Sequence, residues 1–355
     1  MNQQSLKQEA INLLKKLIAK PSFSREEGDT ATLLFDYLDQ KQCHPQRMGN
    51  NVWVSTPKTR KDQRTILLNS HHDTVKPVSG WTKSPFEALE IGERLYGLGS
   101  NDAGGCLVSL LATFLYFQEQ QHLPFQLIFA ATAEEEISGA GGIASLLPAL
   151  SPIDFAIVGE PTLMQMAIAE KGLMVIDAEA QGKAGHAARN EGVNALYIAL
   201  EDIQKIRQYH FPKSSPLLGP VKVSATQIEA GTQHNVVPDS CRFVLDVRTN
   251  ECYTNREVFE LLQNLTKSKL TARSFRLNSS GIPLDHPIVQ SGLKMALNYY
   301  GSPTLSDQAL MPFPSLKIGP GDSARSHTAD EFIVRKEIER GIETYIGLLK
   351  GMVGY

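Results

Sequence analysis

Three short apolar segments of this chain each run into a side chain that can bind a metal ion. The segments and the residues that end them are 65–70 with His71, 127–133 with the carboxylates of residues 134–136, and 155–159 with Glu160. Short apolar runs of this kind are typical of buried strands. In open α/β sheets, sites form at the carboxyl edge of the strands. The pattern therefore predicts an α/β fold with several metal-binding side chains gathered at one edge of its sheet.

The first segment continues as His-His-Asp, and strand geometry separates these three side chains. Alternate residues of a strand share a face, so His71 and Asp73 project together and His72 points away. A carboxylate beside a liganding imidazole can fix the orientation and the tautomer of the ring. We therefore expect His71 to bind a metal ion and Asp73 to support it.

Two glycine-rich loops add one possible ligand each. Asp102 lies in a loop flanked by four glycines, and His327 ends a loop that begins Gly-Pro-Gly at residue 319. Taken singly, each motif has an ordinary structural reading: a hydrogen-bonded histidine, a solvated helix start or a turn. The recurrence of ligand types at successive strand ends favours a metal centre.

The number of possible ligands indicates two metal ions. A catalytic zinc takes three protein ligands and keeps one position for water, so five ligands overfill a single site. If Asp102 bridges, each ion receives three protein ligands, at a metal separation of roughly 3.5–4 Å. The predicted sets are His71, Asp102 and Glu160 for one ion, and His327, Asp102 and Glu136 for the other.

These motifs, in this order, resemble those of the M20 family of zinc aminoacylases and peptidases. They are His-x-Asp-Thr-Val at 71–75, Gly-x-Gly-x-x-Asp at 97–102, Thr-Ala-Glu-Glu-Glu at 132–136, Val-Gly-Glu-Pro-Thr at 158–162 and Gly-Pro-Gly…His at 319–327. Within the family the chain is most similar to the branch of acetylornithine deacetylase and succinyl-diaminopimelate desuccinylase. The resemblance implies a zinc-exopeptidase-like catalytic domain, a mixed sheet flanked by helices, with the five ligands given above. It also implies that Glu135 is the general base and Asp73 the partner of His71.

Three positions depart from the pattern of the family. Glu134 stands where the acidic triplet usually begins with Asp, Asp102 is followed by Ala-Gly-Gly instead of Lys-Gly, and Lys76 separates Val75 from Pro77. None of these departures replaces a predicted ligand.

The length and the order of elements predict an inserted second domain. A chain of 355 residues exceeds what one core usually fills. Between residues 170 and 278 the pattern reads strand, helix, strand, strand, helix, strand, which is the ferredoxin-like order. The expected elements are 173–180, 194–210, 221–229, 241–248, 255–270 and 272–277. We predict a discontinuous metal-binding catalytic domain, residues 1–166 and 279–355, and an inserted dimerisation or lid domain, residues 167–278.

The inserted domain carries three residues that match the substrate-binding pattern of the family. By resemblance, His186 polarises the scissile carbonyl, and Asn235 and Arg248 bind the carboxylate of the substrate. The dimeric M20 deacylases imply a homodimer joined through this domain, with His186 acting in the active site of the partner. The expected substrate is a small N-acyl amino acid.

Composition and charge limit the kinds of binding partner that we expect for this chain. The net charge is −3 and there is no Lys/Arg-rich run, so nucleic acid and membrane surfaces are not expected partners. The longest apolar stretch, residues 107–117, is too short to span a bilayer, and the N-terminus lacks the apolar region of a signal peptide. The four cysteines are widely spaced and indicate neither a disulfide framework nor a cysteine zinc site. We expect a cytoplasmic enzyme.

The reaction implied by these residues is amide hydrolysis by a zinc-activated water, with Glu135 as general base and Co²⁺ able to replace the two Zn²⁺. The sequence has no Gly-x-Ser-x-Gly motif, so no acyl-enzyme is expected. The first choice of substrate is N²-acetylornithine, which gives ornithine and acetate in arginine biosynthesis. N-acetyl- or N-succinyl-citrulline, N-succinyl-diaminopimelate, and di- or tripeptides are alternatives. A phosphodiesterase or a non-catalytic zinc-binding protein is the alternative from a different class.

Overall fold

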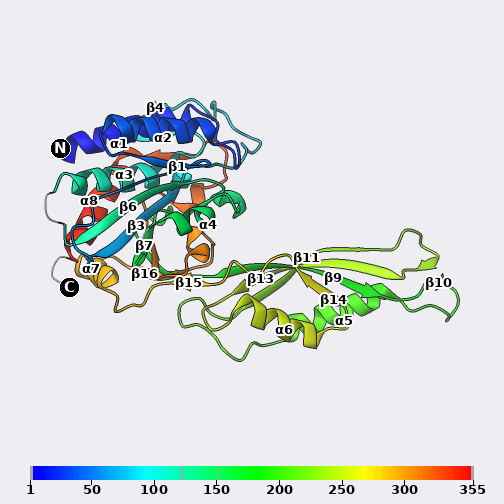
Figure 1. Cartoon of the computed structure of the whole chain (residues 1–355). Coiled ribbons are helices and arrows are strands. Elements are labelled where there is room, and N and C mark those ends of the chain that lie inside the picture. Colours follow the sequence, from blue (N-terminus) through cyan, green and yellow to red (C-terminus); the bar gives the residue numbers. More distant parts are fainter. Residues whose placement is uncertain (1–2, 121–122, 151, 353–355) are drawn as a thin grey trace. The chain divides into compact units, whose positions relative to one another are not determined.

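The computed structural model describes residues 3–120, 123–150 and 152–352 (Figure 1). These residues form two compact units. Unit 1 comprises residues 1–168, 281–300 and 306–355, and unit 2 comprises residues 169–280 and 301–305.

A nine-stranded mixed sheet forms the centre of unit 1. Its order is β1-β2-β6-β3-β7-β17-β8-β15, and β16 pairs with β8. The bounds are β1 (Gln46–Met48), β2 (Asn51–Ser55), β3 (Arg64–His71), β6 (Phe125–Thr132), β7 (Phe155–Val158), β8 (Met166–Glu170), β15 (Ser280–Gly281), β16 (Tyr299–Ser302) and β17 (Ser315–Lys317). The four central strands β6, β3, β7 and β17 are parallel. Their carboxyl ends therefore lie at the same edge of the sheet.

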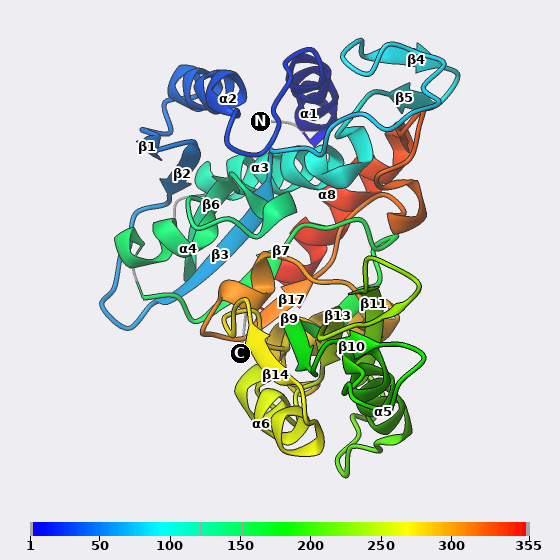
Figure 2. The same cartoon turned by 90° about the vertical axis from the view of Figure 1, so that its right-hand side faces the viewer.

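Helices cover both faces of this sheet, as Figure 2 shows. The first face, which carries Ile66 and Leu68, packs into the main core with five helices, whereas Leu67 turns to the other face with α4. The five helices are α1 (Gln3–Ile18), α2 (Gly28–Gln40), α3 (Gly105–Gln118), α7 (Pro287–Lys294) and α8 (Arg335–Lys350), and α4 is Ile143–Leu146. Consecutive residues of a strand point to opposite faces, so an apolar run serves both layers.

Helix α3 is apolar on all sides because it is enclosed. All but two of its fourteen residues are buried, and it packs against α1, α8 and the sheet. A helix that is hydrophobic all round is expected only in such a position. The loop that carries Asp102 leads directly into α3, which fixes the end of that loop within the core. Among the described residues, no helix is both long and apolar enough to cross a membrane.

A small three-stranded sheet closes the fold beside this loop. It contains β4 (Leu89–Ile91), β5 (Arg94–Tyr96) and β18 (Phe332–Val334), in the order β18-β5-β4. Strand β5 precedes the Asp102 loop, and β18 follows the segment that carries His327. Phe332 pairs with Tyr96 in antiparallel register, so the Asp102 loop begins and the His327 segment ends at neighbouring strands.

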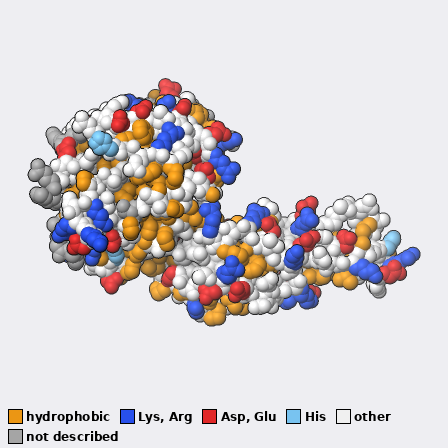
Figure 3. Space-filling view, in the orientation of Figure 1, with side chains coloured by type: hydrophobic (Ala, Val, Ile, Leu, Met, Phe, Trp, Pro, Cys, Tyr) orange, Lys and Arg blue, Asp and Glu red, His pale blue; other side chains and the backbone are white. Residues whose placement is uncertain are grey.

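Unit 2 has the ferredoxin-like topology. Its four-stranded antiparallel sheet, in the order β11-β13-β9-β14, contains β9 (Gly172–Gln181), β11 (Lys222–Ala230), β13 (Ser240–Thr249) and β14 (Lys269–Ala272). Helices α5 (Ala195–Gln208) and α6 (Asn255–Leu265) pack on one face of the sheet. A two-stranded ribbon, β10 (Gly185–His186) with β12 (Val236–Val237), extends from it. On the face of unit 2 seen in Figure 3, acidic and basic side chains are interspersed.

The end of α6 differs from the sequence-based expectation. We expected a helix over 255–270 and a strand over 272–277, but α6 ends at Leu265 and β14 spans Lys269–Ala272. The reason is Asp202 of α5, whose buried carboxylate accepts hydrogen bonds from the backbone N–H groups of Lys267 and Ser268. These donors are thereby taken out of the helix, and the strand begins earlier.

Candidate metal centre

The structure brings the five predicted ligands together at the carboxyl edge of the parallel strands. His71 is the last residue of β3, Glu136 lies in the turn after β6, and Glu160 follows β7. Asp102 lies in the turn Ser100–Gly104, and His327 lies in the loop after β17. Because β3, β6, β7 and β17 are parallel, the four segments that follow them converge on one edge, and the Asp102 loop, which follows β5 of the small sheet, joins them there.

Asp102 lies between the two histidines. Its Oδ1 is 3.3 Å from His71 Nε2, and its Oδ2 is 3.7 Å from His327 Nε2. The other carboxylates complete the cluster: His327 Nε2 is 3.0 Å from Glu136 Oε2, and His71 Nε2 is 3.9 Å from Glu160 Oε1. A carboxylate whose two oxygens face different imidazoles has the arrangement that a bridging ligand requires.

Glu135 also lies in this cluster. Its Oε2 is 3.9 Å from His71 Nε2. Two sets of donor atoms, each within 4.8 Å of one another, could hold an ion: His71 with Asp102 and Glu136, and His71 with Glu135 and Glu160. Glu135 is therefore close enough to the ligands to act on a molecule bound between them.

Asp73 organises the acidic turn as well as His71. Its buried carboxylate accepts hydrogen bonds from the Glu135 and Glu136 backbone N–H groups at 3.0 and 3.2 Å, and from Ser24 Oγ at 2.7 Å. His71 Nδ1 lies 3.0 Å from the Asp73 carbonyl oxygen and 3.5 Å from its Oδ1. The shorter contact of the ring is thus with the Asp73 backbone, while the carboxylate mainly fixes the turn that carries Glu135 and Glu136.

Glu134 and His72 point away from the cluster. The Glu134 carboxylate accepts a hydrogen bond from the Gly141 N–H at 3.2 Å. The His72 ring lies between Thr30 Oγ1 and the Asn50 carbonyl oxygen, at 2.9 Å from each. Of the three consecutive glutamates, only Glu135 and Glu136 place their carboxylates near His71 and His327. As predicted from strand geometry, the side chains of His71 and His72 point in different directions.

The cluster concentrates negative charge on side chains that are largely shielded from solvent, while the His327 ring is half exposed. Burial raises the pKa of Glu135 well above its usual value and raises that of Glu160 to about 8. The hydrogen bond that the His327 ring donates to the Glu136 carboxylate raises the pKa of His327 to about 9. For His71, burial alone would lower the pKa, but the carboxylates of Asp102 and Asp73 outweigh it and raise the pKa well above the ordinary value. Bound cations would stabilise partly buried carboxylates at this density, and oxygen with imidazole donors suits divalent zinc or cobalt. The residues present therefore fit a metal centre.

Two acidic residues that the sequence analysis did not single out border the cluster. Asp307 is buried, accepts a hydrogen bond from Thr132 Oγ1 at 2.8 Å, and burial raises its pKa to about 7. Glu331 is buried against the backbone of the Asp102 loop. Neither residue follows an apolar strand or a glycine-rich motif, so the sequence offers no signal for it; only the folded chain brings it to the site.

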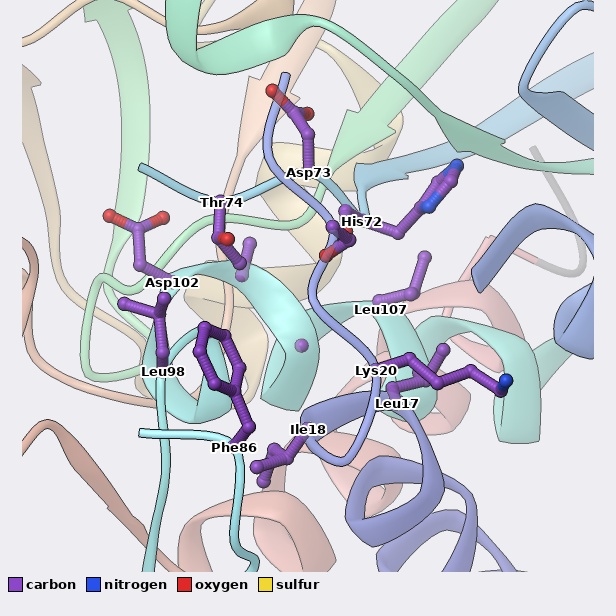
Figure 4. Close-up of a pocket in the computed structure, with 14 residues that line it drawn as sticks. Leu17, Ile18, Lys20, His72, Asp73, Thr74, Phe86, Leu98, Asp102 and Leu107 are labelled. Carbon is purple, nitrogen blue, oxygen red and sulfur yellow. The ribbon is translucent and has the colours of Figure 1, made fainter. Parts of the chain in front are cut away.

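A cavity of about 20 Å³ lies behind the cluster, between the end of α1 and the Asp102 loop (Figure 4). Its lining includes Leu17, Phe86, Asp73, Thr74 and Asp102. Thr74 Oγ1 is buried here and has no hydrogen-bond partner among the described residues. A space of this size accommodates about one water molecule. It is too small for an N-acyl amino acid.

Unit 2 brings together two of its three predicted site residues. His186 lies in the β10–β12 ribbon opposite Val236, and the Ala187 N–H donates to the Asn235 carbonyl oxygen at 3.0 Å. Arg248 lies elsewhere, on β13, where it pairs with Leu173. Its guanidinium group is oriented by the Asp246 carboxylate through contacts of 2.8 and 3.1 Å.

The distance along β13 separates Arg248 from the ribbon. Ser240, at the start of β13, follows the ribbon strand β12 closely in sequence. Arg248 is eight residues further on, which is about 27 Å in an antiparallel strand. Within one chain, therefore, Arg248 stands at one end of the sheet, and His186 and Asn235 stand beyond the other.

A mixed α/β sheet with carboxylates and imidazoles at its carboxyl edge is typical of metallopeptidase-type hydrolases. This chain belongs to the peptidase family M20/M25/M40, which matches residues 67–351. Acetylornithine deacetylases from Shigella sonnei and Proteus mirabilis are 29% and 30% identical to it, over 96% and 93% of both chains respectively. The predicted family is confirmed.

Solved structures agree on the fold. A tripeptidase from Staphylococcus aureus has a TM-score of 0.77 at 20% identity and covers 98% of this chain and 99% of its own. A dinuclear metal binding peptidase of the M20 family from Bacillus subtilis has a TM-score of 0.76 at 16% identity, with 99% and 98% covered. The chain is thus an M20-family hydrolase with the M20 peptidase fold, and the predicted fold class is confirmed.

Proposed function

We propose that this protein is a two-zinc amidohydrolase that cleaves N²-acetylornithine into ornithine and acetate. The observation that carries the proposal is the position of Asp102, whose two oxygens face His71 and His327, with the Glu135 carboxylate beside them. The similarity to acetylornithine deacetylases along nearly the whole chain supports the choice of substrate.

The proposed ligands divide into two sets that share Asp102. His71, Asp102 and Glu160 would hold one ion, and His327, Asp102 and Glu136 would hold the other. When bound, zinc or cobalt supplies Lewis acidity, which polarises a carbonyl group and makes a coordinated water more acidic. The excess of carboxylates over imidazoles in the cluster supports a total metal charge greater than that of one divalent ion.

Glu135 is the proposed general base. It takes a proton from the attacking water and delivers it to the leaving nitrogen of the amide. Burial raises its pKa, so that its carboxylate holds a proton more readily than an exposed glutamate. Asp73 fixes the backbone of Glu135 at 3.0 Å, which keeps the base in place. A base positioned in this way contributes roughly 10²–10⁴-fold to the rate.

His186, Asn235 and Arg248 are proposed to bind the substrate, and their separation supports a site built from two chains. Asn235 and Arg248 are both assigned to the substrate carboxylate, yet about 27 Å of strand lies between Ser240 and Arg248, far more than the length of an N-acyl amino acid. If one chain supplies Arg248 and its partner supplies His186 and Asn235, the three can meet one substrate.

The surface of unit 2 supports a second copy as the partner. Among the described strands, β11 pairs with β13 alone, so one of its edges carries backbone groups available for pairing. On the neighbouring helix α5, Tyr197 is 64% exposed and Leu200 is 48% exposed. Aromatic side chains such as that of Tyr197 are enriched in interfaces. We propose a homodimer joined through these elements.

A panel of N-acyl amino acids, assayed with Zn²⁺ or Co²⁺, tests the proposed reaction. We expect the highest kcat/KM for N²-acetylornithine, with N-acetyl- and N-succinyl-citrulline, N-succinyl-diaminopimelate and short peptides as the comparison set. Higher kcat/KM for another member would reassign the substrate. Absence of hydrolysis across the whole panel, in protein that retains its metal, would contradict the amidohydrolase assignment.

A further inference from the structure

Glu331 is a buried acidic side chain whose carboxylate faces backbone groups. It is 2% exposed. Its Oε1 accepts hydrogen bonds from the Asn101 N–H at 2.8 Å and from the Asp102 N–H at 2.9 Å, and its Oε2 accepts one from the Gly99 N–H at 3.1 Å. One carboxylate thus accepts from three N–H groups in the four-residue stretch of backbone that ends at Asp102.

In the loop that carries Asp102, the backbone N–H groups lack the carbonyl acceptors that a regular α-helix would provide, and the Glu331 carboxylate accepts from them instead. Gly99 has a φ of +73°, which favours glycine, and the chain becomes α-helical only at Gly105. Buried N–H groups without acceptors cost roughly 1–3 kcal/mol each. Glu331 supplies acceptors for three of them, so it fixes the path of the loop up to the Asp102 backbone.

The position of Glu331 also connects this loop to the segment of His327. Phe332 pairs with Tyr96, so Glu331 and Gly97 lie just outside the paired strands, and the Gly97 N–H donates to the Glu331 carbonyl oxygen at 3.0 Å. His327 is four residues earlier on the same segment. Glu331 therefore binds the segment that leads to Asp102 through both its backbone and its side chain, and the chain connects it directly to His327.

We propose that Glu331 is a positioning residue that sets the distance between Asp102 and His327. This distance matters for the metal ion assigned above to His327, Asp102 and Glu136. This inference rests on the proposed two-metal function. Asp102 Oδ2 and His327 Nε2 are 3.7 Å apart, and a loop released from Glu331 would widen the range of this separation. Groups that orient metal ligands typically change metal affinity by roughly 10–100-fold when they are lost.

Glu331→Gln tests the inference with little change in size. The amide replaces one oxygen by an NH₂ group, which would then face a backbone N–H, so at least one of the three hydrogen bonds is lost. Glu331→Asp keeps the charge but shortens the reach. Asp330→Asn is the matched control: the neighbouring Asp330 accepts from the Thr82 and Lys83 N–H groups at 2.9 and 3.1 Å, away from the Asp102 loop.

The measurements are the stoichiometry and Kd of Zn²⁺ by competition with a chelator, the visible absorption of the Co²⁺-loaded protein, and thermal unfolding of the metal-free protein. For Glu331→Gln we expect the weaker of two Zn²⁺ ions to bind 10–100-fold less tightly, with an altered Co²⁺ spectrum. Glu331→Asp should be intermediate. Asp330→Asn should keep both Kd values and the spectrum of the wild type.

Two results would separate the failure of this inference from that of the proposed function. A wild type that binds at most one ion removes the two-metal function and the inference with it. In the second result, the wild type binds two ions, and Glu331→Gln unfolds at a lower temperature but keeps both Kd values and the Co²⁺ spectrum. Glu331 would then have a structural role only. If Glu331→Gln does not fold, unchanged affinities in Glu331→Asp overturn the proposal.

Discussion

At the residue scale, the two adjacent glutamates Glu135 and Glu136 are expected to have separable roles. Glu136 Oε2 lies 3.0 Å from His327, whereas Glu135 lies by His71 and has a raised pKa caused by burial. Glu135→Gln should keep two metal ions per chain and lower kcat by at least roughly 10², with KM nearly unchanged, because a base acts in the transition state. Glu136→Gln should reduce metal content. Steady-state kinetics and elemental analysis of both variants check this, and the opposite pair of phenotypes would exchange the two roles.

The residues also show what sequence can indicate about a site. His71, Asp102, Glu136, Glu160 and His327 could be proposed because each ends an apolar segment or lies in a glycine-rich loop, and the structure brings all five together. Asp307 and Glu331 could not be proposed from the sequence. Their contacts, with Thr132 and with the Asp102 loop, join positions more than 170 residues apart, and nothing local in the sequence distinguishes a buried acid from an exposed one.

At the element scale, the strands were more predictable than their boundaries. The apolar runs of β3, β6 and β7 are buried on both faces, so composition alone marks them. The junction of α6 and β14 was misplaced because its position depends on Asp202, which belongs to a different helix. A local pattern carries no information on such a tertiary hydrogen bond.

The same junction gives a stability prediction. Asp202→Asn should destabilise unit 2 by about 1–3 kcal/mol, because the new NH₂ group faces buried N–H donors. Hydrogen exchange should become faster in residues 255–272 of the variant, while metal content stays at the wild-type value. The control is Asp177→Asn, which removes an exposed ion pair with Arg273 on the same sheet and should change exchange little. Equal exchange rates in both variants would show that Asp202 does not hold this junction.

At the scale of the whole molecule, the separation within unit 2 leads to a test of assembly. We expect that co-expressing His186→Ala with Glu135→Gln, each inactive alone, restores activity in mixed dimers. In such a dimer, the chain that retains Glu135 receives an intact His186 from its partner, so one site is complete. Sedimentation of the purified mixture establishes that dimers are present. A mixed dimer without activity, or a monomeric wild type, would contradict a site shared between two chains.

The proposed bridging of two metal ions by Asp102 is tested most directly by the metal content of purified protein, measured by elemental analysis together with amidase activity. Wild type should hold two divalent ions per chain, which we expect to be zinc, and should lose activity on chelation. Asp102→Ala should lose both ions, because both sets of ligands share it, and Glu160→Ala should chiefly weaken one. A wild type that is fully active with at most one tightly bound ion, or an Asp102→Ala variant that keeps both, would contradict the claim.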